Sequence, residues 1–88
     1  MYIKNQKLKF AENELKRKFA ERERCEDRAC KAQEKRDFER AERYEKRIDE
    51  LHVSIAAQIE LLNNLGFMVN VKVSENGYTE KIEISEKI

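Results

Sequence analysis

Side chains that could act as nucleophiles or metal ligands are few in this sequence. The only histidine is His52, and the two cysteines, Cys25 and Cys30, stand five positions apart. On a helix this spacing points the thiols about 140° apart, which argues against an internal disulfide and against a shared metal site. Neither cysteine has a nearby histidine or a glycine-rich setting that would lower its pKa. We expect two unreactive, half-buried thiols in a reducing cytoplasm.

Motifs that hold phosphates or metals are also missing. The sequence has no phosphate-binding glycine loop, no HExxH and no CxxC. Its eighteen acidic residues mostly alternate with nineteen basic ones, which is typical of a solvated helix surface. No apolar run approaches the roughly 20 residues of a membrane span. The prediction is a protein that is not an enzyme, with no catalytic residue, cofactor, metal, small-molecule substrate or membrane partner.

The composition favours one small domain built mainly of helix. Charged residues make up 42% of the 88 residues, which leaves little for a hydrophobic core. There is no proline and there are only two glycines, Gly66 and Gly77, so a loop-rich fold is excluded. The expected fold class is α+β: one long charged α-helix over residues 1–65, followed by a β-hairpin over residues 66–88.

The long helix is predicted from residue types and from charge spacing. Residues 5–65 consist largely of Glu, Lys, Arg, Ala and Leu, the strongest helix formers. Acidic residues stand four positions before basic ones, as in Glu12–Lys16 and Asp27–Lys31, and such pairs stabilise an exposed helix.

Residues 41–65 carry a heptad pattern. Their apolar residues alternate by three and four, interrupted only by Gln58, and this predicts a coiled-coil seam between two copies in a homodimer. The seam comprises Ala41, Tyr44, Ile48, Leu51, Ile55, Leu62 and Leu65. Residues 53–62 are apolar on more than one stripe, so we expect this segment to be covered on two sides, by a partner helix and by the hairpin.

An earlier apolar block leaves the path of the helix open. Leu8, Ala11, Leu15 and Phe19 also have helical spacing, but they are out of phase with the later seam. Residues 20–37 then offer only alanines and the two cysteines as apolar contacts. Either the helix runs through this region loosely paired, or the chain folds back there as a helical hairpin. The absence of Gly, Pro and Asn between residues 14 and 62 favours the continuous helix.

The C-terminal segment reads as a β-hairpin. Residues 67–73 alternate with period two, and Asn76-Gly77 is a strong signal for a type I′ turn, which needs positive φ at both positions. A two-residue turn pairs Val71 with Ile82, Val69 with Ile84 and Val73 with Glu80, which places the apolar residues on one face. We expect this face to lie on the C-terminal third of the helix, because an isolated hairpin is only marginally stable.

The first half of the chain is basic and the second half is acidic. Residues 1–47 carry a net charge of +5, and residues 48–88 carry −4. Aromatic residues stand among the N-terminal basic ones, and apolar anchors ringed by charge are what a helix offers to a groove on another molecule. The predicted partner-binding residues are Lys4, Lys7, Lys9, Phe10, Leu15, Lys16, Arg17, Lys18 and Phe19. The alternative is that these residues continue the dimer seam in a shifted register.

Taken together, these features predict a small, dimeric interaction protein in the cytoplasm, an adaptor or an inhibitor, that binds a larger partner, most readily a protein. Its composition is typical of phage and mobile-element products. The alternative function is nucleic-acid binding through the basic N-terminal half.

Overall fold

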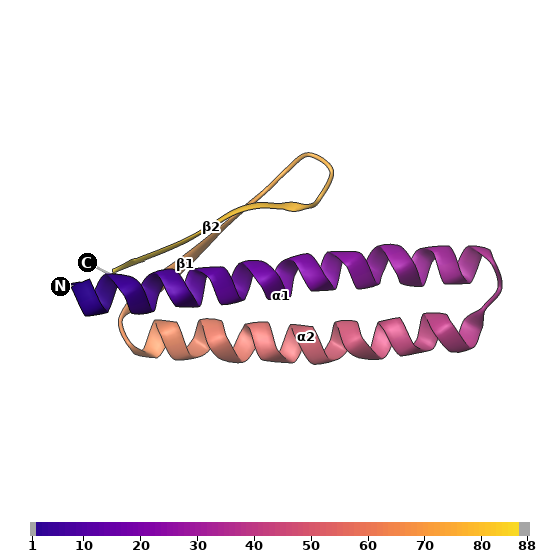
Figure 1. Ribbon diagram of the computed structural model, residues 1–88, viewed down its shortest axis with the longest axis horizontal. Coiled ribbons are helices and arrows are strands. Elements are labelled where there is room, and N and C mark those ends of the chain that lie inside the picture. The colour runs from indigo at the N-terminus through magenta and orange to yellow at the C-terminus, as the bar shows by residue number, and fades with distance from the viewer. Residues whose placement is uncertain (1, 87–88) are drawn as a thin grey trace.

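The computed structural model describes residues 2–86, with side chains from Gln6 onward. It has two α-helices followed by two antiparallel strands, so the α+β prediction is confirmed (Figure 1). The elements are α1 (Tyr2–Glu34), α2 (Phe38–Asn64), β1 (Phe67–Val73) and β2 (Thr79–Glu86). The side chain of Lys4 and residues 87–88 of the predicted hairpin lie outside the described part. Within residues 2–86, neither helix is long and apolar enough to cross a membrane.

The prediction of one continuous helix is wrong, because the chain reverses at residues 35–37. Arg36 adopts the left-handed conformation with φ 59°. Its amide donates to the Gln33 carbonyl at 3.0 Å, and the Asp37 amide donates to the Ala32 carbonyl at 2.8 Å. These two bonds form a Schellman motif, which usually has glycine at the left-handed position. The chain therefore turns without the residue type that would have marked the turn in the sequence.

The second helix begins immediately after this reversal. The Asp37 side chain caps α2 by accepting a hydrogen bond from the Arg40 amide at 3.3 Å. The antiparallel pair that results is held by contacts along its whole length, and Figure 1 shows α1 and α2 side by side. Since both helices belong to one chain, the apolar residues of each helix that face the other have a partner within the same molecule.

The predicted seam of α2 is accordingly used inside the chain. Ala41, Leu51, Ile55 and Leu62 are buried, whereas Leu65 is 65% exposed. Tyr44 and Ile48 are half-buried. These residues were assigned to an interface between two copies because a single continuous helix would have no other helix of the same chain to pack against. Homodimerisation itself stays a prediction.

The hairpin has the predicted register along most of its length. Val71 pairs with Ile82 and Val69 with Ile84, so this part of the prediction is confirmed. Val73 pairs with Thr79 rather than with Glu80, which becomes an extra residue at a bulge.

The turn of this hairpin differs from the predicted type I′ turn. Only Gly77 has positive φ, at 84°, whereas a type I′ turn needs it at Asn76 as well. The Gly77 amide donates to the Ser74 carbonyl at 2.9 Å, and the Ser74 amide donates to the Tyr78 carbonyl at 2.8 Å. A three-residue loop of this form ends in a left-handed glycine and a bulge, which accounts for the shift in register.

The hairpin packs on both helices near the open end of the helix pair, β1 on α2 and β2 on α1 (Figure 1). The core contains buried residues from all these layers: Leu15, Phe19, Ile55, Leu62 and Ile82. Half-buried residues of the hairpin, including Val69 and Val71, pack against it. Toward the turn the hairpin loses this support, and Val73 and Tyr78 are 57% and 52% exposed.

Candidate protein-binding surface

Two of the predicted partner-binding residues belong to the core. Leu15 is 0% exposed and Phe19 is 7% exposed, and both pack against Ile55, Leu62 and Ile82. Neither side chain can reach another molecule while the chain is folded, so their assignment to a partner-binding site is wrong. The error has the same cause as the continuous helix: without α2 beside α1, these apolar residues had no visible partner within the chain.

The other predicted binding residues whose side chains the structure describes are exposed or half-buried. Phe10 is 64% exposed. Lys7, Lys9, Lys16 and Arg17 are also exposed. Lys18 is half-buried and is used inside the molecule, where its ammonium group donates to the Gln58 side chain at 2.7 Å. Phe10 is therefore the one large apolar side chain of the predicted set that a partner could contact.

The bond between Lys18 and Gln58 is part of a polar link between the helices. The Gln58 amide nitrogen donates to the Glu14 carboxylate at 3.3 Å, so Gln58 bridges an acidic and a basic residue of α1. This explains the polar interruption in the apolar pattern of α2. The Gln58 side chain is half-buried, and both the oxygen and the nitrogen of its amide group have hydrogen-bond partners.

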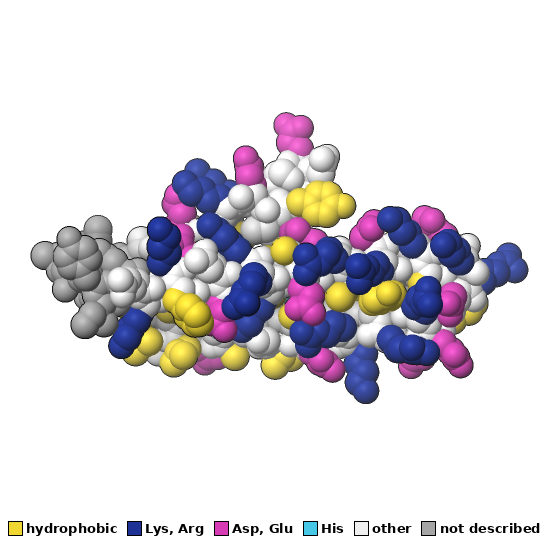
Figure 2. Space-filling model, viewed as in Figure 1, with side chains coloured by type: hydrophobic (Ala, Val, Ile, Leu, Met, Phe, Trp, Pro, Cys, Tyr) yellow, Lys and Arg dark blue, Asp and Glu magenta, His cyan; other side chains and the backbone are white. Residues whose placement is uncertain are grey.

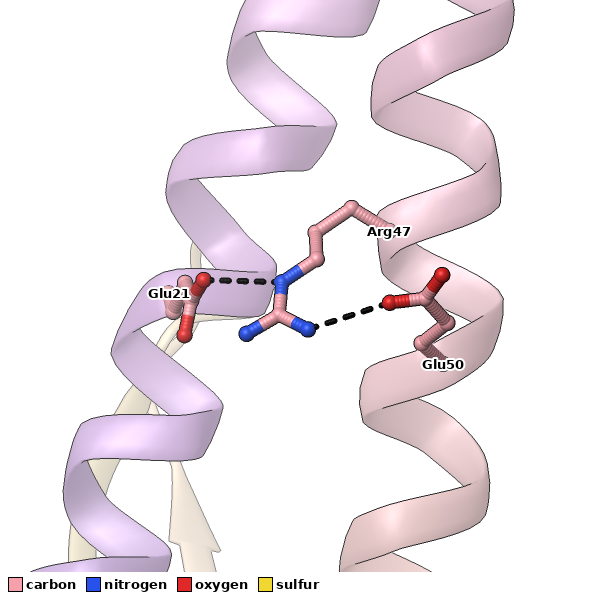
Figure 3. Close-up of polar contacts among 3 residues, drawn as sticks. All are labelled: Glu21, Arg47 and Glu50. Atoms are coloured by element: carbon pink, nitrogen blue, oxygen red, sulfur yellow. Dashed lines mark hydrogen bonds and ion pairs between the residues drawn. The ribbon is translucent and has the colours of Figure 1, made fainter.

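A second polar link is centred on Arg47 of α2 (Figure 3). Its guanidinium donates to Glu21 of α1 at 2.9 Å and to Glu50 of its own helix at 3.1 Å. The hydrogen bond from Arg47 is the main reason why the pKa of Glu21 lies below its usual value. The same bond raises the pKa of Arg47.

These polar residues line a shallow groove of about 390 Å³ between the helices. Arg17, Lys18, Arg24 and Arg47 supply four positive charges, but Glu14, Glu21 and Glu50 stand among them. Arg47 already donates to two of these carboxylates, so its charge is paired within the groove.

The clearest unpartnered surface runs along α2 to its C-cap residue Leu65 and begins on the side of α2 opposite the core. We call it the outer stripe: Val53, Ala57, Leu61 and Leu65, which recur at every fourth residue. At 3.6 residues per turn, Val53 and Ala57 lie about 160° around the helix from the core residue Ile55. Val53, Leu61 and Leu65 are 71%, 59% and 65% exposed. Ala57 is exposed as well.

The outer stripe contrasts with the rest of the helix pair. Figure 2 shows hydrophobic side chains gathered along the edge formed by the C-terminal part of α2, whereas charged side chains dominate the end where the chain reverses. Nothing in the described part of the chain covers the stripe. The sequence signal for the stripe was the apolar character of residues 53–62 on two sides of the helix. We predicted that the hairpin would cover one of these sides and a partner helix the other. The hairpin instead packs on the side that faces the core.

The charged residues of the chain segment that carries the outer stripe are all acidic. Residues 48–71 contain three acidic residues, Asp49, Glu50 and Glu60, and no Lys or Arg. All three are exposed. Asp49 stands four residues before Val53, and Glu60 stands three residues after Ala57, so both border the same side of the stripe. Among residues 6–86, neither of these two carboxylates forms an ion pair.

The sequence matches no protein-family model, and no curated protein or solved structure is significantly similar to it.

Proposed function

We propose that this chain is a small non-enzymatic interaction protein, an adaptor or an inhibitor, that binds a larger protein through the outer stripe of α2. The observation that carries the proposal is the exposure of Val53, Ala57 and Leu61 in one row on α2, continued by the C-cap residue Leu65. A contiguous apolar row left in water is costly, and such patches mark sites of association. Burying it against a partner would remove that cost.

The proposal is tested by capture followed by measured binding. Tagged protein is used to retain partners from the host, and a retained protein is purified and titrated against variants of the chain. Leu61→Asp places a charge in the middle of the stripe, and we expect it to weaken binding at least tenfold. Phe38→Asp is the matched control, because Phe38 is 66% exposed at the other end of the same helix. Equal affinity of the two variants would contradict the proposal.

A second candidate function is nucleic-acid binding by α1. Arg17, Arg24 and Arg28 are exposed and recur at spacings of seven and four, so they form one row on the helix. No ion pair engages these three within residues 6–86. A row of guanidinium groups about 16 Å long suits contact with a phosphate backbone. This function would be supported over the first if the chain bound a duplex with an affinity whose logarithm falls linearly with the logarithm of the salt concentration. The affinity should fall further in Arg24→Gln.

Homodimerisation remains a separate proposal. Sedimentation equilibrium at micromolar concentration tests it directly.

A further inference from the structure

We infer that the partner segment on the outer stripe is a short, basic amphipathic helix. This inference rests on the proposed function and adds the chemistry of the partner. Two independent features of the surface support it: the geometry of the apolar row and the sign of the charges beside it.

The geometry favours a helix that crosses α2 at a steep angle. Residues at every fourth position form a ridge inclined to the helix axis. When such ridges interlock, two helices cross at about −50°, whereas the paired rows of a coiled coil run nearly along the axis. The small side chain of Ala57 lies between Val53 and Leu61 and allows close approach at the crossing. The row is about 18 Å long at 1.5 Å per residue, which matches three to four turns of a partner helix.

The charges favour a basic partner. Asp49 and Glu60 are exposed, unpaired within residues 6–86, and on the same side of the stripe. Lys or Arg side chains that flank the apolar face of a partner helix would meet these carboxylates at the rim of the contact. Opposite charges at a rim mainly increase the association rate and exclude wrong partners, so they set specificity.

The same charges disfavour a second copy as the occupant. Two copies that crossed at Ala57 would bring two sets of Asp49 and Glu60 to one interface. No Lys or Arg occurs from residue 48 to residue 71, so the second copy would offer no basic side chain from this segment. Like charges juxtaposed in an interface weaken it. The net charge of the whole chain is only +1, so attraction to a basic helix would come from this local acidic rim and not from the overall charge.

The experiment uses two designed peptides as probes. Both are 16-residue amphipathic helices with the same leucine face, and their polar faces carry either lysine or glutamate. Titration of the full chain is followed by the fluorescence anisotropy of each labelled peptide. We expect the lysine peptide to bind at least tenfold more tightly than the glutamate peptide, and we expect its affinity to fall as salt is added.

Two variants assign the binding to the stripe and to its rim. Leu61→Asp should abolish binding of the lysine peptide, while the control Phe38→Asp should retain it. The double variant Asp49→Lys, Glu60→Lys should reverse the preference in favour of the glutamate peptide. These substitutions are all on exposed positions, and circular dichroism verifies that each variant is folded.

The alternative outcomes separate this inference from the proposed function. Equal binding of both peptides, lost in Leu61→Asp, would overturn the basic partner but leave the stripe as a binding surface. A wild-type dimer that Leu61→Asp converts to a monomer would show that a second copy covers the stripe, which also overturns the inference. Failure of both peptides to bind a monomeric chain would overturn it as well. Loss of captured-partner binding in Phe38→Asp but not in Leu61→Asp would contradict the proposed function itself.

Discussion

The backbone amide of Thr79 in β2 donates a hydrogen bond to the carboxylate of Glu23 in α1, with a nitrogen–oxygen distance of 2.6 Å. The two residues are 56 positions apart in the chain. Thr79 lies beside the bulge of the hairpin, and Glu23 is half-buried beneath it. This bond fastens the hairpin to α1 at the level where the hydrophobic contacts of the strands end.

Removing this acceptor should loosen the hairpin. Glu23→Ala leaves a partly buried amide without its partner, and we expect a loss of about 1 kcal/mol in the free energy of unfolding. Amide exchange at Thr79 should become faster, while exchange in the middle of α2 changes little. Glu42→Ala is the control, because Glu42 is an exposed helical glutamate without a hydrogen-bond partner among residues 6–86. Unchanged protection of Thr79 would mean that the bond does not hold the hairpin.

The reversal between the helices yields a stabilising substitution. Arg36 has φ 59°, a conformation that glycine adopts without steric cost. We expect Arg36→Gly to raise the free energy of unfolding by about 0.5–1 kcal/mol. The matched Arg28→Gly, within the regular part of α1, should lower it by about 1 kcal/mol. Chemical denaturation of the three proteins checks both signs, and destabilisation by Arg36→Gly would argue against the helical hairpin.

Stability should depend on pH through Glu21 and Arg47. The hydrogen bond from Arg47 lowers the pKa of Glu21 in the folded chain. A carboxyl group with a lowered folded pKa stabilises the fold above its unfolded pKa of about 4.3, and the stabilisation is lost as the pH falls through the folded value. The melting temperature of Glu21→Gln should therefore fall less than that of the wild type when the pH is lowered from 7 to 3. Glu42→Gln should behave like the wild type. A Glu21→Gln profile that coincides with the wild-type profile would show that the pair does not contribute.

The division between core and surface in α1 is tested by a pair of alanine substitutions. Leu15 is fully buried, and Leu15→Ala should cost about 2–5 kcal/mol. Phe10 is 64% exposed, and Phe10→Ala should change stability by no more than about 0.5 kcal/mol. Thermal denaturation distinguishes them. Similar losses in the two variants would mean that the N-terminal part of α1 packs differently from the structure.

Much of the fold could be predicted from the sequence because local patterns determined it. The alternation of residues 67–73 and the position of Gly77 were enough for the hairpin and for the pairing of Val71 with Ile82. The exact turn was missed because a left-handed glycine serves both a type I′ turn and a three-residue loop. Only the three-residue loop leaves Glu80 as an extra residue in the strand.

The break between the helices could not be read from residue types. A Schellman motif is defined by backbone bonds, and here an arginine occupies the position at which glycine would have signalled it. The signal that was present was the change of phase between the two apolar blocks. Missing the break had consequences for the site, because Leu15 and Phe19 then lacked a partner within the chain and were assigned to an external one. The outer stripe of α2 could be found only once the core face of that helix was known.

Site-specific photocrosslinking in the host tests whether the outer stripe is the binding surface. A photoreactive amino acid is placed at Ala56, which is exposed beside the outer stripe, and at Phe38 at the other end of α2. We expect a crosslink from position 56 to a different protein, lost when Leu61→Asp is added, and no such crosslink from position 38. Crosslinking to a protein from position 38 but not from position 56 would contradict the claim that the outer stripe is the binding surface.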